Sequence, residues 1–201
     1  MARPRSFDRD VALACALEAF WQQGYDQTSI SDLTEAMGIN PPSLYAAFGD
    51  KQQLFDEVVE RYQSDPTNFI AAALAEPTAR GAAERLLHGA ADQYTRADRP
   101  HGCMVLSEPK LAQHRALSLQ AVVDRLQRGV DDGDLPRGTD VVALARYLQS
   151  VLAGMSAAAR DGASAAELHA TAELALAAVP TGNPGQAASP RATARRQRPG
   201  R

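Results

Sequence analysis

The chain has few cysteines, few aromatic residues and no long apolar run. Only Cys15 and Cys103 are present among its 201 residues, which excludes the disulfide framework of small secreted domains. The opening MARPRSFDRD is polar and lacks the apolar segment of a signal peptide, and we find no stretch of about 20 apolar residues. These absences predict a soluble, cytoplasmic protein.

Sequence motifs typical of enzymes are also missing. The four histidines are His88, His101, His114 and His169, and none forms an HExxH-type pair. No GxSxG motif or phosphate-binding glycine loop is present. His101 lies close to Cys103 in the chain, but two ligands are too few for a metal site. We therefore expect no enzymatic activity, no metal and no cofactor.

The residues that are present favour helices. Apolar residues make up 45% of the chain, many of them alanine, and aromatic residues make up only 5%. No repeated alternating runs of β-branched residues occur, so we predict an all-α fold. Periodicity, glycines and prolines place the expected helices at about 8–23, 30–37, 42–48, 51–74 with a kink at Asp65-Pro66, 79–97, 111–132, 139–160 and 165–178. A loop after the helix at 79–97 leads into a short apolar segment, Cys103 to Leu106.

Charge is distributed unevenly along the chain. The formal net charge is −3, yet residues 181–201 carry five arginines and no acid, which leaves −8 on residues 1–180. The basic tail at 180–201 has almost no large apolar side chain, and we predict that it is disordered. Such a tail could add salt-sensitive, sequence-independent affinity for DNA. The global charge neither supports nor excludes DNA binding.

Residues 29–55 predict two short helices joined by a tight turn. Ser29 and Asp32 have the spacing of a capping box, and Gly38 is suited to ending the first helix in a left-handed conformation. Pro42 fits the first position of the second helix, so we expect Pro41 to lie outside it. With no capping oxygen on Pro41, the amides at the start of that helix would be open to water or phosphate.

The second short helix has two distinguishable faces. Leu44 and Phe48 fall on one side, whereas Pro42, Ser43 and Ala46 fall on the other and Tyr45 lies on a flank. The outward face is small and polar, as a helix entering a DNA major groove requires. Few hydrogen bonds to bases are available from it, so selectivity would depend partly on DNA shape.

The run TSISDLTEAMGINPPSLYAAFGDKQQLF resembles the helix-turn-helix of TetR/AcrR-type bacterial transcriptional regulators. The matching positions are Gly38, Leu44, Tyr45, Phe48, Lys51, Leu54 and Phe55, with Ala19, Phe20, Gly24 and Tyr25 upstream. The resemblance implies a helix-turn-helix DNA-binding domain at residues 1–50 and a helical effector-binding and dimerisation domain at 51–179. It also implies a sequence-specific regulator, most simply a repressor that a small-molecule effector releases from a palindromic operator.

The residues expected to contact double-stranded DNA lie at the N-terminus and in the helix-turn-helix. Arg3 and Arg5 form a basic arm that could reach phosphates or a minor groove, although an ordinary frayed terminus is an equal alternative. Lys51 is expected to meet a phosphate, and Ala46 could contact a thymine methyl group. The full set of candidates is Arg3, Arg5, Ser29, Ser31, Pro42, Ser43, Tyr45, Ala46 and Lys51.

The resemblance further implies a homodimer and an effector cavity. The last two helices would pair with those of a second subunit, and the candidate interface residues are Leu148, Leu152, Met155, Leu168 and Leu176. The small residues Ala153, Gly154, Ala157 and Ala158 would permit close approach, although a wholly intramolecular bundle is an alternative. The candidate cavity residues are Phe69, His88, Tyr94, Cys103, Met104 and His114. For each of these six, packing in a core or exposure to solvent remains an alternative.

Two other functions stay open at this stage. An accessible thiolate at Cys103 could make the protein a redox-responsive regulator, although no lysine or arginine is adjacent in sequence to activate it. Alternatively, the chain could be a helical binding module that does not use DNA. The sequence does not identify the effector, the operator or the regulated genes, and does not separate repressor from activator.

Overall fold

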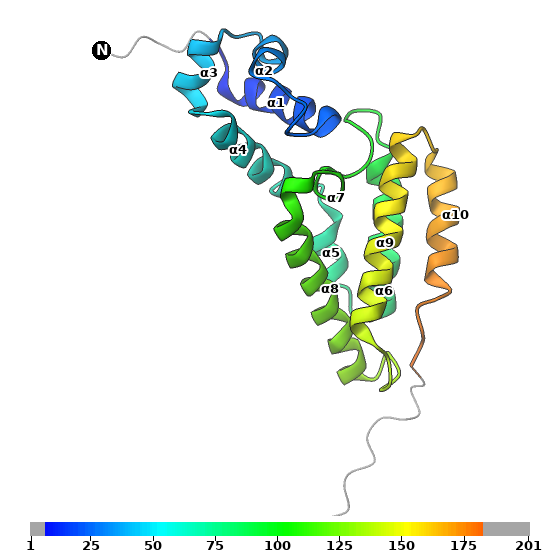
Figure 1. Cartoon of the computed structure of the whole chain (residues 1–201). Helices are drawn as coiled ribbons and strands as arrows, with labels where there is room; N and C mark the ends of the chain where they lie inside the picture. The colour runs from blue at the N-terminus through cyan, green and yellow to red at the C-terminus, as the bar shows by residue number, and fades with distance from the viewer. Residues whose placement is uncertain (1–6, 183–201) are drawn as a thin grey trace, which may run out of the picture.

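The computed structural model describes residues 7–182, and its regular elements in this range are helices, which confirms the all-α prediction (Figure 1). In chain order they are α1 Arg9–Gln23, α2 Ile30–Met37, α3 Pro41–Phe48, α4 Lys51–Gln63, α5 Phe69–Leu74, α6 Ala79–Tyr94, α7 Met104–Ser107, the 3₁₀ helix η1 Pro109–Leu111, α8 Ala112–Asp132, α9 Val141–Arg160 and α10 Ala165–Leu176. The expected tail at 180–201 and the arm at 1–6 lie wholly or largely outside the described residues.

The helix expected at 51–74 is two helices, because the chain turns between α4 and α5. Asp65 Oδ1 accepts hydrogen bonds from the backbone N and hydroxyl of Thr67, at 2.8 and 2.7 Å. Pro66 has no N–H to continue a helix. Asn68 then caps α5 by accepting from the backbone N of Ile70 at 3.0 Å. The sequence predicted only a kink, whereas the helix ends before Pro66 and a new helix begins after it, because each side of Pro66 has its own local hydrogen bonds.

A first hydrophobic core joins α1, α2 and α3 to the start of α4. Phe20 packs against Tyr25 and Phe55, with ring centroids 5.8 and 5.1 Å apart. Trp21 is buried beside them, meets Tyr62 edge-on at 4.9 Å, and also lines a cavity. This core also includes Met104 and Leu111, so the segment after α6 helps to bury the N-terminal helices.

A second core is formed by the long helices α6, α8, α9 and α10, which run side by side below the N-terminal helices (Figure 1). Alanines and leucines dominate it, as the composition predicts, and small side chains allow the helices to approach closely. Its most deeply buried members include Ala83, Leu87, Ala90, Leu126, Leu148, Met155, Ala159, Leu168 and Ala172.

Two polar contacts and one aromatic ring join the two cores. Tyr62 packs against both of them. Arg160, at the end of α9, donates a hydrogen bond to the backbone oxygen of Trp21 at 2.6 Å. Glu108, which is buried between α7 and η1, accepts from the backbone N of Tyr25 at 2.8 Å. The exit of α1 is therefore attached to the C-terminal helices at more than one point.

Four of the five residues predicted to form a dimer interface lie inside the protomer. Leu148, Met155, Leu168 and Leu176 are buried in the second core and cannot present a surface to a second chain. Leu152 is partly exposed and lines a cavity. Helical periodicity did not separate the two faces of α9, because apolar and small residues occur on both of them.

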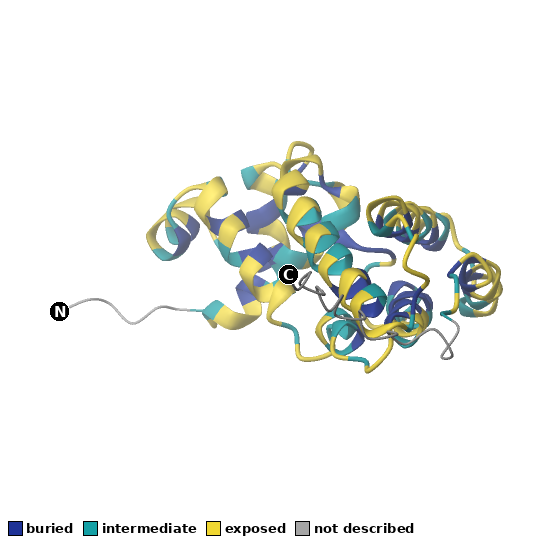
Figure 2. Ribbon diagram, turned by 90° about the horizontal axis from the view of Figure 1, so that it is seen from below, coloured by how far each residue is buried: buried dark blue, intermediate teal, exposed yellow. Residues whose placement is uncertain are grey.

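α9 and α10 each have an exposed side (Figure 2), and the residues on it include several apolar and small ones. By length and composition alone, α9 could cross a membrane, and most of its residues are not buried within the protomer. One side of α9 nevertheless supplies core residues, and Arg146 lies on its exposed side. The exposed side carries Val142, Tyr147, Ala153 and Gly154.

Gly38 ends α2 in the left-handed region at φ 64°, and the backbone N of Ile39 then bonds to the oxygen of Thr34 at 3.0 Å. We expect Gly38→Ala to lower the free energy of unfolding by about 1–2 kcal/mol, because a Cβ is strained in this conformation. Urea unfolding measures the change. Gly138→Ala is the matched control, since no positive φ is found there and an added Cβ meets nothing within 4 Å. An equal loss in both variants would contradict the prediction.

Candidate functional site

The capping box at the start of α2 forms as predicted. Ser29 Oγ accepts from the backbone N of Asp32 at 3.1 Å, and Asp32 Oδ2 accepts from the backbone N of Ser29 at 2.7 Å. The hydrogen bonds from Ser29 lower the pKa of the Asp32 carboxyl below its usual range. Ser29 and Ser31 are both exposed at this end of the helix. The capping box therefore defines where α2 begins after the loop that follows α1.

The start of α3 differs from the sequence prediction. The helix begins at Pro41, and Asn40 caps it by accepting from the backbone N of Ser43 at 2.9 Å. Pro41 and Pro42 have no N–H, and the N–H of Leu44 is bonded to the Asn40 backbone oxygen at 3.1 Å. The expectation of amides open to phosphate was wrong, because two prolines and one cap account for the whole first turn.

The two faces of α3 are as expected. Leu44 and Phe48 are buried in the first core. Tyr45 is 51% exposed, and Pro42 and Ala46 are exposed beside it, whereas Ser43 is half-buried. The exposed face has no charged side chain and no large aliphatic one. A helix with this surface is narrow and uncharged, as close approach to a groove requires.

The basic groups near α3 are already engaged within the protein. Lys51 Nζ donates to the backbone oxygen of Tyr25 at 2.5 Å and lies 4.2 Å from the centre of its ring. An ammonium has three N–H donors, so two remain. Arg9 pairs with Glu57 at 2.6 Å and lies over the ring of Phe48. Arg3 and Arg5 lie outside the described residues.

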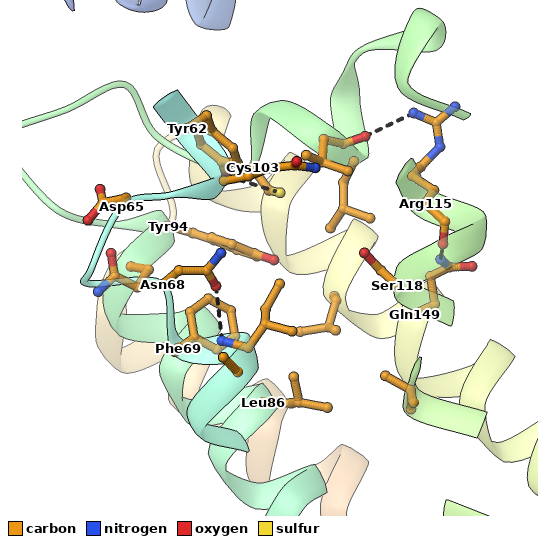
Figure 3. Close-up of a pocket in the computed structure, with 18 of the residues that line it drawn as sticks. Tyr62, Asp65, Asn68, Phe69, Leu86, Tyr94, Cys103, Arg115, Ser118 and Gln149 are labelled. Atoms are coloured by element: carbon orange, nitrogen blue, oxygen red, sulfur yellow. Dashed lines mark hydrogen bonds between the residues drawn. The ribbon is translucent and has the colours of Figure 1, made fainter. Parts of the chain in front are cut away.

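A cavity of about 360 Å³ lies between the C-terminal helices and the end of α4 (Figure 3). Phe69, Tyr94 and Cys103 line it, as predicted. Sequence reasoning missed most of the other lining residues, which include Trp21, Tyr62, Asn68, Leu86, Arg99, Arg115, Ser118, Leu119, Val122, Gln149 and Leu152. Those on α8 and α9 have the same spacing as core residues, and no sequence signal distinguishes a cavity-lining residue from a core residue.

Three predicted cavity residues lie elsewhere. His88 Nδ1 is 2.8 Å from Nδ1 of His169, at the contact between α6 and α10. Met104 is buried in the first core, because α7 turns toward the N-terminal helices. His114 lies on α8 away from the cavity, and its Nδ1 has no hydrogen-bond partner among the described atoms. Between residues 7 and 182, no three metal-ligating side chains of the His, Cys, Asp or Glu types come together.

Cys103 and two tyrosines form the polar part of the cavity nearest to α4. The Tyr62 hydroxyl donates to Cys103 Sγ at 3.3 Å, and Ser156 Oγ accepts from the backbone N of Cys103 at 2.8 Å. Cys103 is only 8% exposed. Burial raises the pKa of Tyr62 well above its usual value, and it does the same for Tyr94, with further contributions from Cys103. Both phenols therefore stay protonated at neutral pH.

A capped helix, a left-handed glycine turn and a short second helix with an exposed uncharged face define a helix-turn-helix, the element of DNA-binding regulators. The family model described as bacterial regulatory proteins, tetR family, matches residues 12–58. The repressor ComR of Escherichia coli is 34% identical over 180 residues, covering 83% of this chain and 86% of ComR. BdcR of the same organism is 33% identical, covering 89% of this chain and 92% of BdcR.

A solved structure of a TetR family regulator is also similar to this chain. A cysteine mutant of the TetR family regulator CifR, complexed with 26-base-pair operator DNA, is 38% identical and has a TM-score of 0.84, over 89% of this chain and 100% of that one. The chain belongs to the TetR family, and it is a DNA-binding transcriptional regulator.

The raised pKa values of Tyr62 and Tyr94 predict how stability changes in alkali. Unfolded phenols ionise near pH 10, and both folded phenols stay protonated above that pH. The stabilisation is complete below about pH 10 and is lost as the pH rises toward the folded pKa values. We expect the double variant Tyr62→Phe/Tyr94→Phe to lose less stability in this range than the parent. Urea unfolding at a series of alkaline pH values measures the slope, and equal slopes would contradict the prediction.

Proposed function

We propose that this regulator is a repressor that binds a palindromic operator through α3 and leaves it when a small molecule enters the cavity. The observation that carries the proposal is the pairing of a helix-turn-helix with a lined cavity at the far end of α4. Its relatives ComR and BdcR are repressors, and CifR was solved on operator DNA. Such a protein works where its DNA is, which favours the cytoplasm.

The proposed division of labour follows the predicted domains. Residues 1–50 hold the DNA-binding helices, residues 51–179 hold the effector and dimer elements, and residues 180–201 form a basic tail. On DNA, Tyr45 and Ser43 contact base edges or sugars, and Ala46 contacts a thymine methyl group. Lys51 turns its free N–H donors to a phosphate. Ser29, Ser31 and Pro42 border the same surface, and the arm with Arg3 and Arg5 adds backbone contacts.

We expect specific binding to DNA flanking the protein's own gene, and we expect scrambling either half-site to remove it. Tyr45→Ala should cost about 1–3 kcal/mol of specific affinity, since Tyr45 is the largest exposed side chain on α3. Lys51→Met should weaken binding to every sequence and reduce the salt slope by about 1. Fluorescence anisotropy at several salt concentrations measures both effects.

Lys110→Met is the control for the lysine change. Its ammonium also lies on the Tyr25 ring, at 4.5 Å, but the residue belongs to η1 rather than to the helix-turn-helix. The phosphate role of Lys51 fails if both lysine variants change the salt slope equally. The repressor proposal itself fails if the protein does not distinguish the intact site from the scrambled ones.

We propose that a second copy of the chain covers the exposed faces of α9 and α10. Leu174 is 78% exposed, and Val142 and Tyr147 are also large exposed apolar residues. Ala153 and Gly154 lie on the same side of α9, and an added Cβ at Gly154 would meet nothing within 4 Å of this protomer. Small side chains allow two helices to approach closely. A two-fold dimer would place two α3 helices to read inverted half-sites.

We expect Leu174→Arg to convert the dimer to a monomer, because two guanidinium groups would be buried in an apolar contact related by two-fold symmetry. Sedimentation velocity measures the oligomeric state. Leu117→Arg is the matched control, since Leu117 is 64% exposed on α8, outside the proposed interface. Monomers in both variants, or a parent protein that is already monomeric, would contradict the interface.

The cavity is proposed to act on DNA binding through α4 and through the segment after α6. Tyr62 carries the first route, because it lies on α4 and lines the cavity. Arg115 carries the second, donating to the backbone oxygens of Val105 and Glu108 at 2.9 and 2.5 Å, and Glu108 holds Tyr25. An effector regulates only if it favours one spacing of the two α3 helices over another.

A further inference from the structure

Two hydroxyl groups point into the same part of the cavity from opposite walls. Tyr94 projects from α6 and Ser118 from α8, and Figure 3 shows both hydroxyls directed toward the space between them. Tyr94 is only 4% exposed. The Tyr94 hydroxyl lies near Cys103, but neither it nor the Ser118 hydroxyl makes a hydrogen bond within ordinary distance and angle limits among the described residues. Ser118 is half-buried. Each hydroxyl can therefore donate to a ligand in the cavity.

The charged groups at the cavity wall are engaged elsewhere. Arg99 donates to Asp65 Oδ2 at 3.0 Å, so each neutralises the other. Arg115 forms no ion pair within the described residues, but its guanidinium points away from the cavity and donates to three backbone oxygens, of Val105, Glu108 and Pro109 (Figure 3). A ligand with a net charge would lose its hydration without meeting an unpaired charge directed into the cavity. The wall therefore favours a ligand that carries no charge.

The rest of the wall is apolar and the space is small. Around the two hydroxyls lie branched and aromatic side chains from α5, α6, α8 and α9, which are Phe69, Ile70, Leu86, Leu119, Val122 and Leu148. At about 360 Å³ the cavity is near the lower end of the range of about 300–1,000 Å³ for small-molecule sites. A compact apolar body would fill it.

We propose that the cavity takes a small, uncharged, largely apolar molecule with one oxygen acceptor, held between the hydroxyls of Tyr94 and Ser118. This inference rests on the proposed function, because it names the class of effector for the same site. The raised pKa of Tyr94 supports it, since a protonated phenol can donate a hydrogen bond to a ketone, ether or alcohol oxygen. Ser118 supplies a second donor from the other wall.

Trp21 offers a direct measurement of binding in the whole protein. It is the single tryptophan of the chain, lines the cavity and packs edge-on against Tyr62. A ligand in the cavity should therefore change its emission. Titration with four probes of equal chain length, namely 2-octanone, 1-octanol, octanoate and octylammonium, separates uncharged from charged ligands. We expect the first two to bind at least about tenfold more tightly, because no unpaired charge points into the cavity.

Removal of each hydroxyl tests the position of the oxygen. Tyr94→Phe and Ser118→Ala should each weaken 2-octanone binding about fivefold to tenfold, the usual effect of one hydrogen bond. Thr139→Val is the control, since it removes a hydroxyl from the turn between α8 and α9, where it bonds to the Pro136 oxygen, and it should leave 2-octanone binding unchanged. Thermal unfolding checks that the variants are folded, and Ser118→Ala provides the test if Tyr94→Phe is not.

The inference is overturned if octanoate or octylammonium binds as tightly as 2-octanone. It is also overturned if folded hydroxyl variants bind 2-octanone as the parent does, or if no probe changes Trp21 emission. Operator release is measured separately by anisotropy. Binding that depends on Tyr94 without release would support the ligand class and contradict the proposed effector role. Release by 2-octanone that is lost in Tyr94→Phe would support both.

Discussion

The packing of Tyr62 between the two hydrophobic cores is the contact on which the rest of the structure depends. Its ring meets Trp21 of α1 on one side, and its hydroxyl donates to Cys103 on the other. It also lies on α4, the helix that follows α3, and it borders the cavity. A ligand that enters the cavity cannot move Tyr62 without disturbing Trp21, because protein interiors are close-packed. The contacts of Tyr62 with Trp21 and Cys103 therefore couple the N-terminal core to the C-terminal core through side chains.

Local signals in the sequence were sufficient for the helices and for the helix-turn-helix. Capping residues, Gly38 and the spacing of Leu44 and Phe48 act within a few residues, so they can be read without knowledge of the fold. The start of α3 was misplaced by one residue because Asn40, rather than Pro41, was the relevant cap. The exposed and buried faces of α3 followed from periodicity alone.

The cavity and the exposed faces of α9 and α10 could not be predicted in the same way. Leu148 and Met155 are both core residues on the buried side of α9, yet only Leu148 also lines the cavity. That difference depends on where α5, α6 and α8 stop filling space, which is a property of tertiary packing. His88 and Met104 had plausible spacing for a cavity, but His88 contacts His169 of α10 and Met104 packs in the first core. An apolar helix does not reveal from its sequence which side faces a neighbour.

The two prolines at the start of α3 have a consequence for recognition beyond capping. An eight-residue helix is too short to be stable alone, and much of its ordering entropy would otherwise be lost on contact with DNA. Pro41 and Pro42 hold φ near its helical value already in the unfolded chain, so less entropy remains to be lost when the helix forms. The helix is preorganised, and a sparse set of contacts can then give usable affinity.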